Sequence, residues 1–128
     1  MKKAVQSFLQ DEGWHVTVAW GRDRGIDIEA FKQGRHLVIE AKGDASSPQQ
    51  QANYFLGALG DLAQRMADPQ AIYALALPDN ERFRGLVGRL PSLARDRLVR
   101  LVFFVARADG ELNVQVDGDE RVQGLLEI

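Results

Sequence analysis

Residues 25–43 read GIDIEAFKQGRHLVIEAKG, two apolar runs that carry ionisable side chains and are joined by a Gln-Gly pair. Apolar runs separated by two turn-forming residues are typical of a β-hairpin. Carboxylates and amines inside strands cost free energy unless a partner or a metal ion compensates their charge. This stretch therefore predicts a hairpin that holds either a metal site or a buried salt bridge.

The loop of this hairpin predicts its register. If the Gln-Gly pair forms the loop, Lys32 faces Arg35, and counting back along both strands places Asp27 opposite Glu40. Directly opposed residues have Cβ atoms about 5 Å apart, and Lys42 shares the face of Glu40 because side chains alternate. Two carboxylates this close repel each other and raise the pKa of one of them, which a divalent metal ion relieves. A β-bulge in either strand shifts this pairing by one residue.

The composition is that of an ordinary globular protein. The 128 residues are 45% hydrophobic and 27% charged, so we expect a single domain over residues 1–128. Cysteine is absent, which excludes disulfides and thiolate metal sites. No apolar run approaches the ~20 residues of a membrane span, and the initial Met-Lys-Lys leads into polar residues rather than a signal sequence. We therefore expect a cytoplasmic protein that does not bind membranes.

The charge of the chain is slightly negative and unevenly distributed. A net charge of -2 and a pI of about 5.7 argue against a general nucleic-acid coat protein. Residues 81–100 nevertheless contain two acids and six arginines, namely Arg82, Arg84, Arg89, Arg95, Arg97 and Arg100. This segment either attracts phosphate or forms a solvated amphipathic helix whose arginines pair with local acids.

The remaining patterns predict a mixed α/β protein. Ser47 and Gln50, on either side of Pro48, indicate the start of a helix that runs to about Ala67. Elsewhere we expect helices near 2–12 and from about 80, the latter broken or kinked at Pro91 and resuming to 98, and strands over 16–20, 71–77, 101–105 and 112–116. The predicted order is α-β-β-β-α-β-α-β-β, a mixed sheet with helices on both sides.

The chain resembles the PD-(D/E)XK nuclease superfamily in two features. These are the strand sequences Gly-Ile-Asp-Ile and Val-Ile-Glu-Ala-Lys and the helix-hairpin-helix-strand order. The likeness is to its restriction-endonuclease-like and Holliday-junction-resolvase-like members, and it covers residues 2–107. It implies a restriction-endonuclease-like core in which Asp27 and Glu40 bind Mg²⁺ or Mn²⁺. It also implies that Ala41 adds its backbone carbonyl to the metal site and that Lys42 orients or deprotonates the attacking water.

The resemblance extends to the helix that follows the hairpin. Gln50 and Tyr54 are four residues apart and similar to the Gln-x-x-x-Tyr signature of exonuclease-type members, which implies that Gln50 supports catalysis. DNA is the implied substrate and partner. The residues expected to contact DNA are Arg22, Arg24, Tyr54, Arg82 and Arg84. Proteins of this size in the superfamily act on duplex DNA as homodimers or with a protein partner.

The sequence departs from the superfamily pattern at two places. Ile26 stands where the motif has proline, and the first helix offers Lys3, Gln6 and Gln10 where many members carry a glutamate. Loss of that acid favours a one-metal site or an inactive one. The chain is thus either a metal-dependent nuclease or a catalytically inactive nuclease-fold protein that acts as an interaction or regulatory subunit, in which Lys42 and Glu40 form an ion pair.

Two further polar residues share the Glu40 face of the hairpin. His36 lies about 13 Å along the strand from Glu40, so a surface position is expected. Glu29 is expected to be an exposed partner of Lys32 or Arg35.

Overall fold

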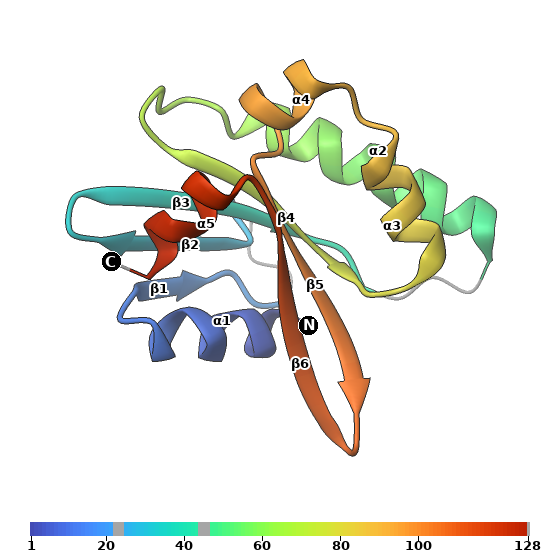
Figure 1. Cartoon of the computed structure of the whole chain (residues 1–128), viewed down its shortest axis with the longest axis horizontal. Coiled ribbons are helices and arrows are strands. Elements are labelled where there is room, and N and C mark those ends of the chain that lie inside the picture. The colour runs from blue at the N-terminus through green and yellow to red at the C-terminus, as the bar shows by residue number, and fades with distance from the viewer. Residues whose placement is uncertain (22–24, 44–46, 128) are drawn as a thin grey trace.

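The computed structural model describes residues 1–21, 25–43 and 47–127. Within these residues, six strands form one sheet in the order β1-β2-β3-β4-β5-β6, with helices on both faces (Figure 1). The strands are β1 (His15–Val18), β2 (Ile28–Lys32), β3 (Arg35–Ala41), β4 (Ile72–Pro78), β5 (Leu101–Ala108) and β6 (Glu111–Gly118). The helices are α1 (Lys2–Asp11), α2 (Pro48–Gln64), α3 (Glu81–Gly88), α4 (Ser92–Arg97) and α5 (Glu120–Leu126).

The centre of the sheet is parallel and its flanks are antiparallel. Strands β3, β4 and β5 run in the same direction, whereas β1–β2, β2–β3 and β5–β6 pair antiparallel. All seven residues of β4 are buried, as expected for a continuous apolar strand that is covered on both faces. The carboxyl ends of β3, β4 and β5 therefore meet at one edge of the sheet, the edge where α/β proteins commonly bind ligands.

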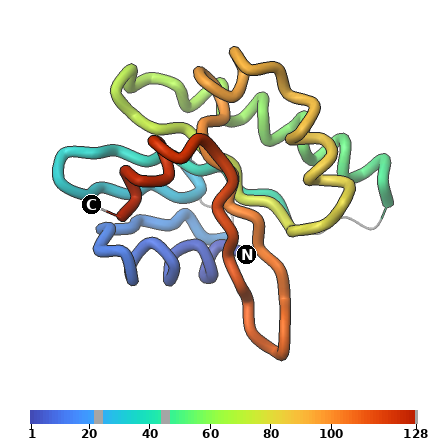
Figure 2. Tube along the Cα trace, in the orientation of Figure 1, coloured from blue at the N-terminus to red at the C-terminus, as the bar shows by residue number. Residues whose placement is uncertain are grey.

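Two apolar clusters hold the helices against the sheet. On one face, Val5 and Leu9 of α1 and Val122 of α5 pack against buried strand residues such as Phe103. On the other face, α2 and α3 contribute Phe55, Leu62 and Phe83 to a second cluster around β4 and β5 (Figure 1). The β5–β6 hairpin extends past both layers, and the amino terminus lies beside it (Figure 2). None of the helices in the described ranges is long and apolar enough to cross a membrane.

The predicted hairpin is confirmed in its register. Lys32 pairs with Arg35 and Ile28 pairs with Ile39, without a bulge between them. Gln33 and Gly34 have φ values of 49° and 78°, the left-handed backbone that a two-residue hairpin loop requires. Because β2 begins at Ile28, Asp27 lies one residue before the ladder, at the end of the sheet.

The other elements confirm the predicted fold class and correct its details. The Ser47 Oγ accepts the backbone N–H of Gln50 at 3.1 Å and caps α2 as expected. The chain breaks at Pro91 into α3 and α4. The structure adds α5 after the last strand, a helix absent from the predicted order. In addition, β1 ends at Val18, so Trp20 lies beyond the strand predicted to contain it.

Candidate active site

The hairpin and α2 enclose a cavity of about 460 Å³ at the carboxyl end of β3. Its walls are formed by Lys2, Asp27, Glu40, Lys42, Asp61 and Arg65, with Gly25 and Ala41. The structure thus brings together four of the predicted site residues, namely Asp27, Glu40, Ala41 and Lys42. It adds three charged residues that the sequence motif does not include: Lys2 from α1, Asp61 from α2 and Arg65 directly after α2.

Glu40 is the buried acid of this cavity, with 3% of its surface exposed. Burial, followed by a hydrogen bond and charge repulsion from the Asp27 carboxyl, raises the pKa of Glu40 to about 7, although Arg65 opposes the shift. The two carboxyls therefore meet as the hairpin register predicts. A cation between the two carboxyls would stabilise the charged form of Glu40.

Asp27 is fixed between the ends of two strands. Its Oδ2 accepts the backbone N–H of Ala41 at 2.9 Å, and its own carbonyl accepts the N–H of Ala19 at 2.9 Å. Its Oδ1 lies 3.5 Å from Lys2 Nζ, which also donates to the carbonyl of Ala19 at 2.6 Å. The first helix therefore contributes an amine to the site and not an acid.

Helix α2 and the residue directly after it supply counter-charges to Lys42 and Glu40, which share one face at the end of β3. Lys42 Nζ lies 3.1 Å from Asp61 Oδ2, and Arg65 Nε lies 3.3 Å from Glu40 Oε1. Four residues of helix and two residues of strand both advance about 6–7 Å, so the two pairs match in spacing. Lys42 consequently pairs with Asp61, and the ion pair with Glu40 that was expected for an inactive protein does not form.

His36 continues this row of charge pairs away from the cavity. Its Nδ1 lies 2.8 Å from Asp68 Oδ2 and its Nε2 lies 2.5 Å from Glu29 Oε2. Burial alone would lower the pKa of His36, but hydrogen bonds and charge from Asp68 and Glu29 outweigh it and raise the pKa. Glu29 thus pairs with His36 instead of Lys32 or Arg35, because His36 is its diagonal neighbour on the same face of the hairpin, whereas Lys32 and Arg35 lie on the other face.

The donor set of the cavity suits one hard metal ion. The described ranges contain no group of three or more His, Cys, Asp or Glu side chains placed to hold a metal, which leaves Asp27 and Glu40 with the carbonyl of Ala41. Mg²⁺ commonly binds through one or two carboxylates, keeping several waters and accepting substrate phosphates. The two facing carboxyls fit such an ion, whereas the third acid of the cavity, Asp61, is paired with Lys42.

The other predicted site residues lie outside this cavity. Gln50 and Tyr54 are exposed near the start of α2, and Gln50 lies about three helical turns from Asp61. Arg82 Nε donates to the carbonyl of Pro48 at 3.4 Å. A catalytic role for Gln50 and DNA contacts of Tyr54 and Arg82 remain predictions.

Two of the expected DNA-binding arginines fall outside the described residues, and one is engaged within the chain. Arg22 and Arg24 lie in the range that the structure does not describe. Arg84 forms two hydrogen bonds to Asp79, at 2.7 and 3.0 Å, and its guanidinium lies 4.2 Å from the ring centre of Phe104. This arrangement agrees with the reading in which arginines of this segment pair with local acids.

Comparison with known proteins supports the fold and leaves the family open. No model of a known protein family matches the sequence, and no curated protein matches it. A solved structure of an fdxN element excision controlling factor protein from Anabaena variabilis is similar, with a TM-score of 0.51 and 18% identity over 89% of this chain and 95% of that chain. An XisH family protein from Nostoc punctiforme PCC 73102 gives a TM-score of 0.48 and 18% identity, covering 90% and 96% of the two chains.

Proposed function

We propose that the chain is a metal-dependent nuclease of the PD-(D/E)XK type that hydrolyses phosphodiester bonds in DNA. Asp27, Glu40 and the carbonyl of Ala41 would hold one Mg²⁺ or Mn²⁺ ion, and Lys42 would act on the attacking water. The observation that carries this proposal is the contact between the Asp27 and Glu40 carboxyls in a cavity that Lys42 also lines. DNA as substrate rests on the resemblance of the hairpin to that superfamily.

The side chains of the cavity have separate tasks in this reaction. When bound, the metal supplies positive charge that stabilises the phosphate oxygens of the transition state and makes an attacking water more acidic. Lys42 donates one hydrogen bond to Asp61, which leaves two ammonium hydrogens for a water and a phosphate oxygen. Lys2 and Arg65 add two further cations to the wall, and fixed cations favour the charge that develops during phosphoryl transfer.

Incubation with plasmid and linear DNA in the presence of Mg²⁺ or Mn²⁺ tests the proposal. We expect cleavage by the native protein and a loss of about 100-fold or more in Lys42→Ala, because a residue acting on the nucleophile contributes on that scale. Lys3→Ala is the matched control, since Lys3 is an exposed lysine of α1 outside the cavity. Equal activity in Lys42→Ala would remove the mechanism.

A second candidate is a catalytically inactive member of this fold that acts as an interaction or regulatory subunit. One observation favours it: Asp27, Glu40 and Lys42 each have a partner of opposite charge within the chain. The Anabaena variabilis structure is described as an excision controlling factor, which is consistent with a regulatory task. A homodimer or a protein partner belongs to either candidate and remains a prediction.

Thermal unfolding with and without metal separates the two candidates. An ion that binds only the folded protein must raise its melting temperature. The nuclease proposal expects Mn²⁺ or Mg²⁺ to raise it in the native protein but not in an Asp27→Asn/Glu40→Gln double variant. The regulatory candidate expects no metal-dependent rise of the melting temperature in either protein.

A further inference from the structure

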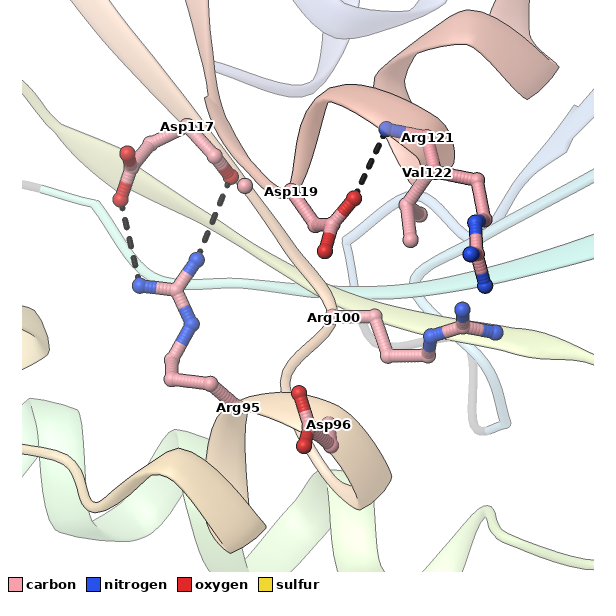
Figure 3. Close-up of a pocket in the computed structure, with 8 residues that line it drawn as sticks. Arg95, Asp96, Arg100, Asp117, Asp119, Arg121 and Val122 are labelled. Carbon is pink, nitrogen blue, oxygen red and sulfur yellow. Dashed lines mark hydrogen bonds and ion pairs between the residues drawn. The ribbon is translucent and has the colours of Figure 1, made fainter.

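A second cavity, of about 540 Å³, lies at the amino-terminal end of β5, between α4 and the start of α5 (Figure 3). Strands β3, β4 and β5 are parallel, so this end of β5 is at the opposite edge of the sheet from Ala41 and the candidate active site. The cavity is therefore a separate feature, and its chemistry does not depend on catalysis at Asp27 and Glu40.

One wall of the cavity is formed by the ion pair of Arg95 and Asp117. The guanidinium of Arg95 donates to the Asp117 carboxylate at 3.2 Å, to the Asp117 carbonyl at 3.4 Å and to the Val99 carbonyl at 3.0 Å. These bonds tie α4 to the end of β6 (Figure 3). Arg95 and Asp117 thus shape the cavity without leaving charge for a ligand.

Arg100 and Arg121 are in the opposite situation. Their guanidinium groups point toward one another (Figure 3). No hydrogen bond or ion pair from the described ranges reaches either group. Asp119 lines the same cavity, but its Oδ1 accepts the backbone N–H of Arg121 at 2.7 Å rather than its guanidinium. The two positive charges repel each other, and Asp119 does not neutralise them. An anion between the two guanidinium groups would therefore stabilise them.

The backbone holds these two arginines in place. The N–H of Arg100 donates to the carbonyl of Tyr73 at 2.9 Å, immediately before β5 begins. Gly118 ends β6 directly against it, and a Cβ at this glycine would lie 2.7 Å from the carbonyl oxygen of Arg100 and 2.8 Å from Leu101 Cδ2. A glycine is therefore required for the close approach that carries the chain from β6 past Arg100 and brings Arg121 to the same cavity.

We propose that Arg100 and Arg121 bind a phosphate group between their guanidinium groups. Each guanidinium presents paired N–H donors that match two oxygens of a phosphate, and both remain charged at every physiological pH. Asp96 also lines the cavity from α4 and is exposed, with no ion pair to another described residue. Its negative charge opposes anion binding and lowers the affinity.

Titration of the metal-free protein with inorganic phosphate, followed by NMR signals of the arginine Nε–H groups, tests this site. We expect saturable binding that weakens about tenfold or more in Arg100→Ala and in Arg121→Ala, because each removes a charge-assisted hydrogen bond. Arg97→Ala is the matched control, an exposed α4 arginine outside the cavity, and should bind as the native protein does. Lys42→Ala should also be unchanged, which separates this site from the candidate active site.

A variant that should increase the affinity for phosphate makes the test independent of folding defects. Asp96→Asn removes the opposing charge and should tighten phosphate binding, whereas loss of fold would weaken it. Absence of saturable binding, or equal binding by the native protein and both arginine variants, would overturn the proposal.

Two oligonucleotides identify the source of the phosphate. If the ligand is a terminal phosphate of a nucleic acid, a 5′-phosphorylated strand should bind more tightly than a 5′-hydroxyl strand, and Arg100→Ala should abolish the difference. If it is a backbone phosphate, both strands should bind and lose affinity equally in Arg100→Ala. If it is a small phosphate compound, binding of inorganic phosphate should depend on the two arginines, whereas binding of neither oligonucleotide should change in Arg100→Ala.

Discussion

Arg65 Nε, directly after the end of α2, lies 3.3 Å from Oε1 of Glu40 on β3, in the middle of a row of three charge pairs between this end of the helix and the strand. Lys42 with Asp61 lies on one side of it and His36 with Asp68 on the other. The strand residues of the row are positive, negative and positive, and those of α2 and the residues after it are the reverse. This alternation fixes how α2 lies along β3, since a shift by one turn would place like charges together.

Replacement of Glu40 should stabilise the metal-free protein at alkaline pH. The folded chain raises the pKa of Glu40 from 4.5 to about 7, so the folded state binds its proton more tightly than the unfolded state does. This contribution to stability is complete below about pH 4.5 and is lost as the pH rises through about 7, a total of about 3 kcal/mol. Glu40→Gln should therefore unfold at higher urea concentration than the native protein at pH 8.5.

The same comparison at acid pH provides the control. At pH 4.5 Glu40 is protonated in the folded state, so the native protein and Glu40→Gln should have nearly equal free energies of unfolding. A Glu40→Gln variant that is less stable at pH 8.5 would show that the carboxylate is a net stabilising partner of Arg65 and not a destabilised acid.

Arg65→Met should raise the pKa of Glu40 further. Arg65 lowers this pKa through its hydrogen bond and its charge, and the methionine keeps the aliphatic packing while removing both. The titration of the Glu40 carboxyl carbon, followed by NMR, should move upward in Arg65→Met and stay close to native in Arg65→Lys. A downward shift would contradict the assigned partners of this carboxyl.

His36 should stabilise the protein most at low pH. Its pKa is raised in the folded state by Asp68 and Glu29, so its contribution is complete below about 6.5, the pKa of an unperturbed histidine, and disappears as the pH rises through the folded value. The loss of stability in His36→Gln, measured by urea unfolding, should be larger at pH 5.5 than at pH 9. His15→Gln, at an exposed position of β1, is the matched control variant.

The hairpin and its acids could be predicted because their geometry is local. Once the loop residues Gln33 and Gly34 are identified, alternation fixes which side chains face each other over the next few residues. The contact of Asp27 with Glu40 needed no knowledge of the rest of the fold. The central strand could also be predicted from the sequence, because a short apolar run that ends at Pro78 is typical of a buried strand.

The three partners of these motif residues, Lys2, Asp61 and Arg65, depend on contacts between distant elements. Asp61 and Arg65 are four residues apart in a mostly apolar helix, and this spacing was the available signal for a charged stripe. Which residues of β3 this charged stripe contacts depends on how α2 is rotated about its axis against the sheet, and the sequence does not give that rotation. Helix α5 was missed for a related reason, because two buried residues one turn apart, Val122 and Leu126, are too few to establish a helical period.

Lys2 should compete with a metal ion for Asp27. Its removal should therefore strengthen metal binding and weaken DNA binding. Its ammonium lies 3.5 Å from Asp27 Oδ1 and is 25% exposed. Lys2→Met removes a positive charge beside the proposed ion and should tighten Mn²⁺ binding about fivefold by calorimetry, while weakening DNA binding measured in Ca²⁺. Lys3→Met is the control that changes net charge equally from outside the cavity, and neither affinity should move by a comparable amount. Weaker Mn²⁺ binding in Lys2→Met alone would instead mean that this lysine organises the carboxylates for the metal through its hydrogen bond to the carbonyl of Ala19.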